Sequence, residues 1–209
     1  MQLSYAIVSR CQNWISAILF KLTDLHGLMI PYILLFFRCL CKIAREFRML
    51  DFARFIGFFL CHAIWSVSDG EMLIPFRGDQ TPTDRNLTRY TGDNQEMVTQ
   101  LERELQSPTA DVVFRVMCYD GFFTNQGVRR DSIYARACHY LSGGTSEVFM
   151  IVPYLPAHPT PTDFKVFRPK YISMPTTTDI GPFTEALWEG IFAHQQGATV
   201  WNTHMDQSE

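Results

Sequence analysis

The sequence predicts an α+β fold, a two-layer sandwich in which an antiparallel sheet of about five to six strands carries helices on one face. Three observations lead to this prediction. Segments of alternating apolar and polar residues are separated by glycine-containing turns, which is typical of antiparallel strands. Two other segments repeat apolar residues at helical spacing. The composition, 47% hydrophobic and 19% charged, is that of a globular protein.

The chain divides into an apolar, basic N-terminal segment (residues 1–56), an α+β domain (residues 57–200) and a polar tail (residues 201–209). The first segment holds seven Lys or Arg against three Asp or Glu, whereas the whole chain has a net charge of −3, so the rest of the chain is acidic. An acidic domain disfavours nucleic-acid binding, which needs a basic surface for the phosphates. We therefore expect no nucleic-acid partner.

The N-terminal segment leaves three interpretations open. Its apolar runs, Trp14–Phe20 and Leu28–Phe37, are shorter than the roughly 20 residues of a membrane-spanning helix, but the basic residues that follow would suit an anionic membrane surface. The segment could be a marginal membrane anchor through residues 14–48, or it could be helices packed on the domain. In the third interpretation Met49 is the natural start, and residues 1–48 are an upstream extension. Scattered cysteines without a Cys-x-x-Cys pair favour reduced thiols, and so a cytoplasmic protein, membrane-associated under the first interpretation.

The α+β domain is expected to begin with a β-hairpin whose turn is Asp69-Gly70. An Asp-Gly pair between two alternating runs is a strong hairpin signal. In the resulting register Trp65 lies on an entirely apolar face, and we expect it in the core. The opposite face places His62 directly across from Arg77. Residues 81–94, which are polar and rich in turn formers, are expected to form a surface loop after this hairpin.

Residues 112–119 and 132–140 alternate as the two strands of a second, long hairpin. A symmetric three-residue loop between them would bring Arg136 onto the apolar face, which burial of a charged side chain makes unfavourable. We therefore expect the register to slip by one residue, so that Phe114, Val116 and Cys118 lie opposite Ala137, Ala135 and Ile133 in that order. A β-bulge at Gly121 or Gly127 would produce such a slip, because an extra residue in one strand changes the pairing beyond it.

A third strand follows the turn Ser142-Gly143-Gly144-Thr145. The pairing expected from this turn brings Ala135 opposite Val152, and it keeps the same apolar face as the second hairpin. Residues 164–167 are apolar enough to form a fourth strand of this part of the sheet. The three successive antiparallel connections predict a meander, which is the central part of the expected sheet.

Two amphipathic helices are expected, residues 94–106 and residues 182–196. The first has Asp93 or Asn94 at its N-cap, because a side-chain oxygen there accepts a hydrogen bond from a backbone N–H of the first turn. The second is expected to end at Gly197, since glycine is the usual residue after the last turn of a helix. One apolar stripe on each helix indicates that one face packs on the sheet.

The function that these patterns favour is a non-catalytic binding or accessory domain for an unknown protein partner. The face of the first hairpin opposite the core offers a mixed apolar and cationic strip on a rigid sheet, which suits recognition. The end of the second hairpin carries further charged residues. The candidate binding residues are His62, Arg77, Arg130 and Asp131.

The alternative is a small enzyme that acts on a polar substrate. Its candidate residues are Asp120, Arg130, Asp131 and His139, with Asp120 and His139 as the acid–base candidates. Convergence of these side chains in one pocket would favour the enzyme, and scatter along an edge would favour the binding domain. We expect neither a metal nor a cofactor, since the sequence has no cluster of metal ligands, phosphate loop or nucleotide-binding fingerprint.

Overall fold

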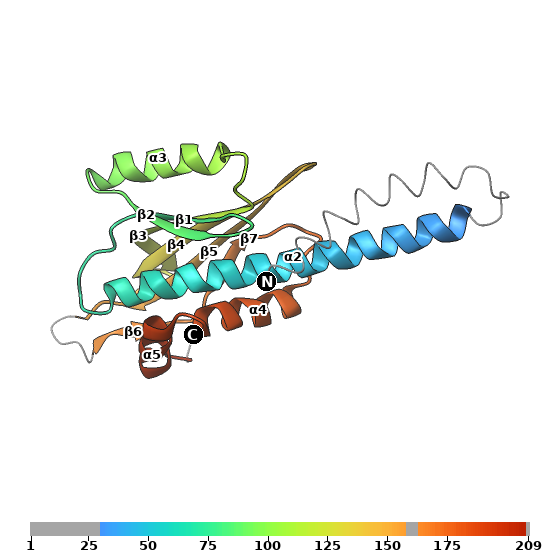
Figure 1. Cartoon of the computed structure of the whole chain (residues 1–209). Coiled ribbons are helices and arrows are strands. Elements are labelled where there is room, and N and C mark those ends of the chain that lie inside the picture. The colour runs from blue at the N-terminus through green and yellow to red at the C-terminus, as the bar shows by residue number, and fades with distance from the viewer. Residues whose placement is uncertain (1–29, 158–162, 208–209) are drawn as a thin grey trace. The chain divides into compact units, whose positions relative to one another are not determined.

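The computed structural model describes residues 30–157 and 163–207, with side chains described from residue 46 onward. The chain separates into two compact units, Met1–Met49 and Leu50–Glu209, and the second contains the sheet and the helices that cover it. The described elements (Figure 1) are, in chain order, α2 (Ile30–Val67), β1 (Phe76–Gln80), β2 (Arg85–Arg89), α3 (Asn94–Gln106), β3 (Phe114–Asn125), β4 (Val128–Leu141), β5 (Gly144–Leu155), β6 (Lys165–Val166), β7 (Lys170–Ser173), α4 (Ile180–Phe192) and α5 (Gln195–His204).

The α+β fold with an antiparallel sheet is confirmed. Seven strands form one sheet in the order β2-β1-β3-β4-β5-β6, and β7 also pairs with β5. Residues 50–67 of α2 lie on one face together with α4 and α5 (Figure 1). On this face a Cβ atom at Gly78 of β1 would collide with the ring of Phe59 of α2. The sequence predicted helices on one face only, but the other face carries α3 (Figure 1), whose Leu105 packs against Met117 of β3.

The main core lies between α2, α4 and the sheet. Its side chains are apolar and fully buried, so their removal from water is the main contribution to the stability of the domain. They include Phe52, Phe55, Ile56, Phe59, Leu60, Phe76, Val116, Ala135, Val148, Phe183, Leu187 and Ile191.

The predicted hairpin at Asp69-Gly70 is wrong, because the preceding residues continue α2 as far as Val67. The apolar positions fit a helical stripe as well as an alternating strand, and the helix already runs in from residue 30. The Asp-Gly pair ends the helix instead: Gly70 has a φ of +92° and its N–H donates to the carbonyl of Val67 at 3.1 Å. Trp65, expected in the core, is only half-buried.

Glu46–Val67 of α2 is long and apolar enough to cross a membrane when length and composition alone are judged, with a mean hydropathy of 1.4. Most of this stretch is buried inside the protein, and a core helix meets the same criteria. It is therefore weak support for membrane association. The three interpretations of the N-terminal segment stay predictions, because residues 14–29 and the side chains of residues 30–45 lie outside the described part of the chain.

A short strand, β2, occupies part of the predicted polar loop at residues 81–94. It runs antiparallel to β1, from Arg85 opposite Gln80 to Arg89 opposite Phe76, and it forms one edge of the sheet. Four of its five residues are exposed. An edge strand with exposed faces has no need of alternating apolar residues, and for this reason the pattern in the sequence did not indicate a strand.

The long hairpin of β3 and β4 is slipped by one residue from the symmetric pairing, but in the direction opposite to the predicted one, because Val116 lies opposite Ala137 rather than Ala135. Arg136 lies opposite Met117, and it is still off the face packed on α2. The expected bulge at Gly121 or Gly127 is wrong, because the ladder between the two strands is continuous. A two-residue turn sets the register. Its residues, Gln126 and Gly127, have φ values of +49° and +83°, as the tight turns of twisted hairpins require.

The pairing of β4 with β5 differs from the prediction by two residues. Ala135 lies opposite Met150 rather than Val152. A displacement by an even number keeps every side chain on its face of the sheet, so the predicted core residues of these strands are still buried. The fourth strand expected at residues 164–167 is the short strand β6, which pairs with the end of β5.

The helix predicted for residues 94–106 has these same bounds as α3, and Asp93 caps it by accepting two backbone hydrogen bonds. The helix predicted for residues 182–196 is two helices, α4 and α5. Gly197, which was expected to end a helix, lies inside the first turn of α5. A Cβ atom there would collide with Cys61 of α2, so close packing of two helices requires this glycine.

Two further glycines bring α4 against α2. A Cβ atom at Gly57 of α2 or at Gly190 of α4 would collide with the backbone of the other helix. The two backbones can therefore approach closely, and the short connection after α4 places His194 and α5 beside α2. The expected polar tail begins within α5, where Trp201 is fully buried.

Candidate functional site

Two histidines from distant parts of the chain meet on the side of the domain formed by α2 and α5. His62 lies on α2, and His194 is the N-cap residue of α5. The Nδ1 atom of His62 is 3.1 Å from the Nε2 atom of His194. The other ring nitrogen of His194 accepts a hydrogen bond of 3.0 Å from the backbone N–H of Gly197. This capping interaction fixes the orientation of the His194 ring.

Two arginines from the edge strand β2 lie beside the histidines. The Nη2 atom of Arg89 is 3.2 Å from the Nε2 atom of His62. The guanidinium of Arg85 lies 4.6 Å from the ring centre of Phe58 of α2. Both arginines are exposed. Within residues 30–157 and 163–207, neither forms an ion pair with a carboxylate.

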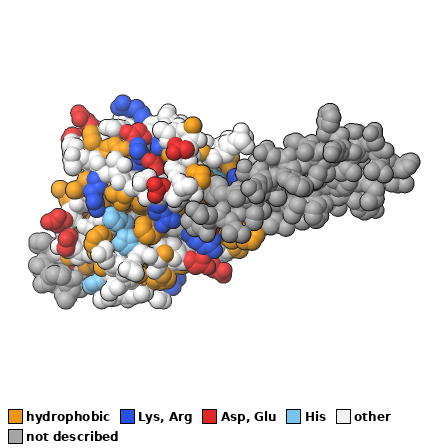
Figure 2. Space-filling view, viewed as in Figure 1, with side chains coloured by type: hydrophobic (Ala, Val, Ile, Leu, Met, Phe, Trp, Pro, Cys, Tyr) orange, Lys and Arg blue, Asp and Glu red, His pale blue; other side chains and the backbone are white. Residues whose placement is uncertain are grey.

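Aromatic rings surround the two imidazoles. The ring centre of Trp65 is 5.5 Å from that of His62 and 5.8 Å from that of His194. The ring of Phe58 lies 5.0 Å from that of His194. Figure 2 shows histidine side chains at the surface over α2. The histidine–arginine surface is the name used below for His62, Arg85, Arg89 and His194 together.

Both imidazoles are neutral near pH 7. The pKa of His62 is lowered from 6.5 to about 4, mostly by burial and to a smaller extent by His194 and the charge of Arg89. Burial also lowers the pKa of His194. A neutral imidazole carries one N–H donor and one acceptor nitrogen. The positive charge of the surface therefore comes from Arg85 and Arg89, and the histidines contribute hydrogen-bonding groups.

Hydrogen bonds connect the backbone N–H of Gly197, the His194 ring and the His62 ring, and Arg89 lies next to His62. The groups at the two ends, the N–H of Gly197 and the guanidinium of Arg89, are both donors. The backbone N–H of Gly197 occupies Nδ1 of His194, so the neutral ring carries its proton on Nε2 and donates it to His62. His62 accepts at Nδ1 and carries its own proton on Nε2. That proton faces Arg89, whose guanidinium has only donors. Two donors thus lie next to each other, and one acceptor at hydrogen-bond distance from both nitrogens would satisfy both.

An anion matches this arrangement better than a metal ion. No group of three or more His, Cys, Asp or Glu side chains suited to a metal occurs among the described residues. The guanidinium of Arg89 beside Nε2 of His62 would also repel a cation. A carboxylate or phosphate oxygen, in contrast, accepts hydrogen bonds from both an imidazole N–H and a guanidinium.

The structure separates Arg77 from His62, which the predicted hairpin placed opposite each other. Arg77 lies on the face of the sheet that carries α3, where it forms ion pairs with Asp79 at 2.8 Å and with Glu104. Burial acts to lower the pKa of Arg77, but the charges of Asp79 and Glu104 outweigh it and raise the pKa. The expected strip of His62 and Arg77 does not exist, because residues 50–67 form a helix on the opposite face.

The acid–base candidates of the alternative, Asp120 and His139, do not meet. Asp120 pairs with Ile133, and His139 is six residues further along β4, which corresponds to about 20 Å at the rise of a strand. His139 is buried, with its ring 4.9 Å from that of Phe114. Its position at the buried end of the apolar face is that of a core side chain.

Asp120 and Asp131 lie near each other at the other end of the hairpin. Asp120 accepts a hydrogen bond of 2.9 Å from the hydroxyl of Tyr154 and another from a backbone N–H. Burial raises the pKa of Asp120, its two hydrogen bonds oppose the rise, and the charge of Asp131 adds to it. The guanidinium of Arg130 lies over the ring of Phe167, 4.5 Å from its centre.

The prediction from sequence found His62 but missed its neighbours Arg85, Arg89 and His194. The two arginines are four residues apart and so share one side of a strand, a signal that was lost because β2 was interpreted as a loop. His194 was placed inside a continuous helix. The break between α4 and α5 at this residue, which makes it a cap, has no glycine or proline to mark it.

Comparison with known proteins gives no relative from which a function could be transferred. No protein-family model matches the chain, no protein of curated function matches its sequence, and no solved structure matches its fold. The function is therefore argued from the geometry of the histidine–arginine surface.

Proposed function

We propose that the protein is a non-catalytic binding domain whose histidine–arginine surface docks an acidic segment of a partner protein. One observation carries the proposal: the Nη2 atom of Arg89 lies 3.2 Å from the Nε2 atom of His62, and the tautomer inferred above makes both nitrogens donors. A carboxylate oxygen beside the two nitrogens would accept from both and would be held by charge-assisted hydrogen bonds. The neighbouring Arg85, which has no carboxylate partner in the described part of the chain, extends the positive surface along β2.

The spacing of the arginines favours a protein segment over a single small anion. Arg85 and Arg89 are four residues apart on one strand, which separates their Cα atoms by about 13 Å. One carboxylate or phosphate cannot span this distance. An extended segment with two acidic residues four positions apart has the same repeat, so each carboxylate could reach one arginine.

A simpler role for the arginines is to protect the edge strand β2 from pairing with other chains, since charged side chains on an edge have this effect. Edge protection needs charge alone, and it leaves the two histidines without a role. The His194 ring, 8% exposed and fixed by capping, directs a proton through His62 toward the surface. This fixed direction favours recognition of an acceptor.

The cysteines support a cytoplasmic setting for this function. Cys61, Cys118 and Cys138 are free and buried. Burial raises the pKa of Cys61 to about 12 and that of Cys138 to about 11, so both are unreactive thiols. Buried reduced cysteines suit a reducing compartment. Association of the domain with a membrane through residues 14–48 is a separate proposal, and it rests on the apolar and basic pattern of that segment.

The proposal is tested with a synthetic extended peptide that carries two glutamates four positions apart, and with the same peptide carrying glutamines. We expect calorimetry to detect binding of the glutamate peptide only. Arg89→Met should weaken binding about tenfold, because a hydrogen bond to a charged group is lost. Arg103→Met, which removes an exposed arginine of α3 on the other face of the sheet, is the matched control and should leave the affinity unchanged.

Binding should also take up protons. A carboxylate beside His62 favours its charged form and so raises its pKa above the value of about 4 in the free protein. The affinity should therefore increase as the pH falls from 7 to 5, while the glutamates stay ionised. Equal binding of the two peptides, or an affinity that Arg89→Met leaves unchanged, would contradict the proposed function.

A further inference from the structure

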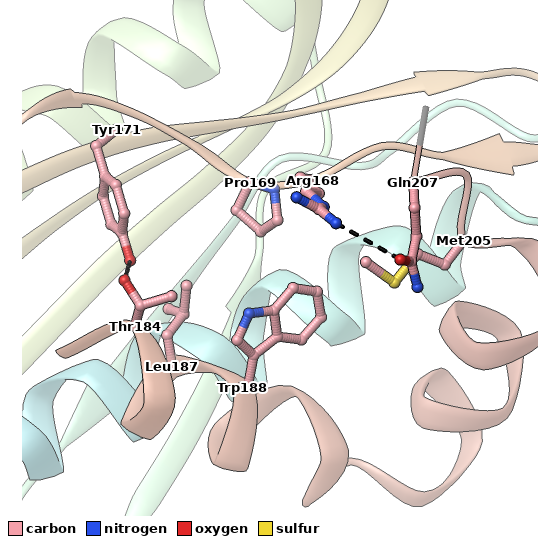
Figure 3. A pocket seen from close by; sticks show the side chains of 8 residues that line it. All are labelled: Arg168, Pro169, Tyr171, Thr184, Leu187, Trp188, Met205 and Gln207. Carbon is pink, nitrogen blue, oxygen red and sulfur yellow. Dashed lines mark hydrogen bonds between the residues drawn. The ribbon is translucent and has the colours of Figure 1, made fainter. Parts of the chain in front are cut away.

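A second candidate site shares no residue with the histidine–arginine surface. A cavity of about 350 Å³ lies between β7, α4 and the residues that follow α5 (Figure 3). Its volume is at the lower end of the range found for small-molecule sites in proteins. The side chains that determine its chemistry are Arg168, Pro169, Tyr171, Thr184, Trp188 and Met205.

One wall of the cavity is a tryptophan ring that its neighbours hold in place. The ring of Trp188 stacks on that of Phe192, with centres 5.7 Å apart and an angle of 22°. The fully buried ring of Trp201 packs against it nearly at right angles, at 83°. In Figure 3 the indole of Trp188 lies below Pro169 and beside Met205. A flat, rigid, apolar wall of this kind suits a planar ring of a ligand.

The two ends of the cavity are polar and differ in charge. At one end, Arg168 is exposed and its guanidinium makes a long contact of 3.5 Å with the amide oxygen of Gln207. Across the described ranges, Arg168 forms no ion pair with a carboxylate. At the other end the hydroxyls of Tyr171 and Thr184 share a hydrogen bond of 2.8 Å. Figure 3 shows these two polar ends on opposite sides of Trp188.

We propose that this cavity binds a small monocarboxylate with a planar apolar body, such as an aromatic acid. The guanidinium of Arg168 matches a carboxylate in shape and charge, and a contact of 3.5 Å to a neutral amide is easily replaced. Arg168 is the one charged side chain among the residues that line the cavity, and it balances a single negative charge, so a monoanion fits better than a phosphate dianion. The aromatic ring then lies against Trp188, and the hydroxyls of Tyr171 and Thr184 face its far end.

The experiment uses 2-naphthoate as the probe and 2-naphthalenemethanol as its neutral counterpart, with the full chain and detection by calorimetry. From its number of atoms, 2-naphthoate should bind with a dissociation constant of about 1 mM or below. The neutral alcohol should bind at least about tenfold more weakly. Arg168→Gln should weaken binding of 2-naphthoate by about tenfold or more, since it removes a charge-assisted pair. Trp188→Leu should weaken both probes, because the flat wall is lost.

Arg89→Gln is the matched control, because it removes an exposed arginine from the other candidate site. It should leave binding of 2-naphthoate unchanged. Arg168 is exposed, so Arg168→Gln should fold as the unchanged protein does, and the thermal transition checks this. Three outcomes would overturn the proposal. In the first, 2-naphthoate does not bind at a concentration about 10 times the expected dissociation constant. In the second, the alcohol binds as tightly as 2-naphthoate, and in the third, Arg89→Gln loses binding of 2-naphthoate while Arg168→Gln retains it. The third outcome would place the aromatic acid on the histidine–arginine surface.

Discussion

The two faces of the sheet hold their charged side chains in opposite ways. On the face that carries α3, Arg115 is 3% exposed and its Nε atom lies 2.6 Å from Oδ1 of Asp79, whose other oxygen pairs with Arg77. On the face that carries α2, Arg85 and Arg89 are exposed and have no carboxylate partner among the described residues. Arg115 is therefore buried and paired with a carboxylate, whereas Arg85 donates only to the neutral side chain of Gln80 and Arg89 lies against His62.

This difference separates positions that hold the fold from positions suited to bind. On the α3 face, Arg115 also donates to the backbone carbonyls of Glu104 and Ser107, and Tyr90 donates to the carboxylate of Glu104. Removal of one member of such a buried network leaves another without a partner, which is costly. An exposed arginine without a carboxylate partner contributes little to stability and remains available to a ligand.

The largest effect on stability is expected for Asp79→Ala. The substitution leaves Arg115 buried without its carboxylate, which should lower the free energy of unfolding by about 3–5 kcal/mol. Urea denaturation measures the change. The double variant Asp79→Ala with Arg115→Met should lose less than the sum of the two single variants, because the two side chains act on each other. Additive losses would show that the pair is not coupled, and the α3 face would then resemble the α2 face.

A smaller loss is expected for Tyr90→Phe. The hydroxyl of Tyr90 donates to Glu104 in the last turn of α3. A hydrogen bond to a charged group contributes about 1.5 kcal/mol to stability. Burial acts to raise the pKa of Glu104, but the hydrogen bonds from Tyr90 and Gln100 and the charge of Arg77 outweigh it and lower the pKa. Urea denaturation should show this loss at pH 7 and a smaller one at pH 3, where Glu104 is closer to protonation. An equal loss at both values would contradict a role for the charge.

The histidines of the α2 face should make stability depend on pH in a different range. Because the pKa of His62 is lowered from 6.5 to about 4, the unfolded chain binds a proton between these values that the folded protein does not bind. The free energy of unfolding should therefore decrease as the pH falls from 6.5 to 4. His194, whose pKa is also lowered, acts in the same direction. In His62→Phe the decrease should be smaller. An unchanged slope would mean that His62 titrates normally in the folded protein.

The sequence predicted the fold where local signals agreed with long-range packing. The bounds of α3 and its cap at Asp93 follow from one short amphipathic stripe. The long hairpin follows from the need to keep Arg136 off the apolar face. The first hairpin failed because the stretch around Trp65 is apolar at both helical and strand spacing, and the turn signal of Asp69-Gly70 serves a helix end equally well.

The candidate site was less accessible to prediction, because its parts come from α2, β2 and the break between α4 and α5. His62 could be singled out as a polar residue in an apolar run, but its contact with His194 lies 132 residues away along the chain. That contact depends on the close packing of α2 with α4 at Gly57 and Gly190, which no periodic pattern indicates. Arg89 reaches His62 only because β2 pairs with β1 at the sheet edge.

The smallest effect on stability is expected for Arg89→Met, and its sign tests the arrangement of donors on the α2 face. Arg89 is exposed and without a carboxylate partner in the described ranges, so its removal should change the free energy of unfolding by no more than about 0.5 kcal/mol. The change should not be a loss, because the guanidinium faces the N–H of His62 rather than an acceptor. Removal of the positive charge should also raise the pKa of His62 above about 4, and the pKa should stay below 6.5 because burial is the larger cause of its shift.

Urea denaturation of Arg89→Met measures the free energy of unfolding, and an NMR titration of its His62 imidazole measures the pKa, with Arg103→Met as the control. A clear loss of stability together with an unchanged pKa would show that Arg89 donates to an acceptor in the free protein, and the α2 face would then be a satisfied network like that of the α3 face.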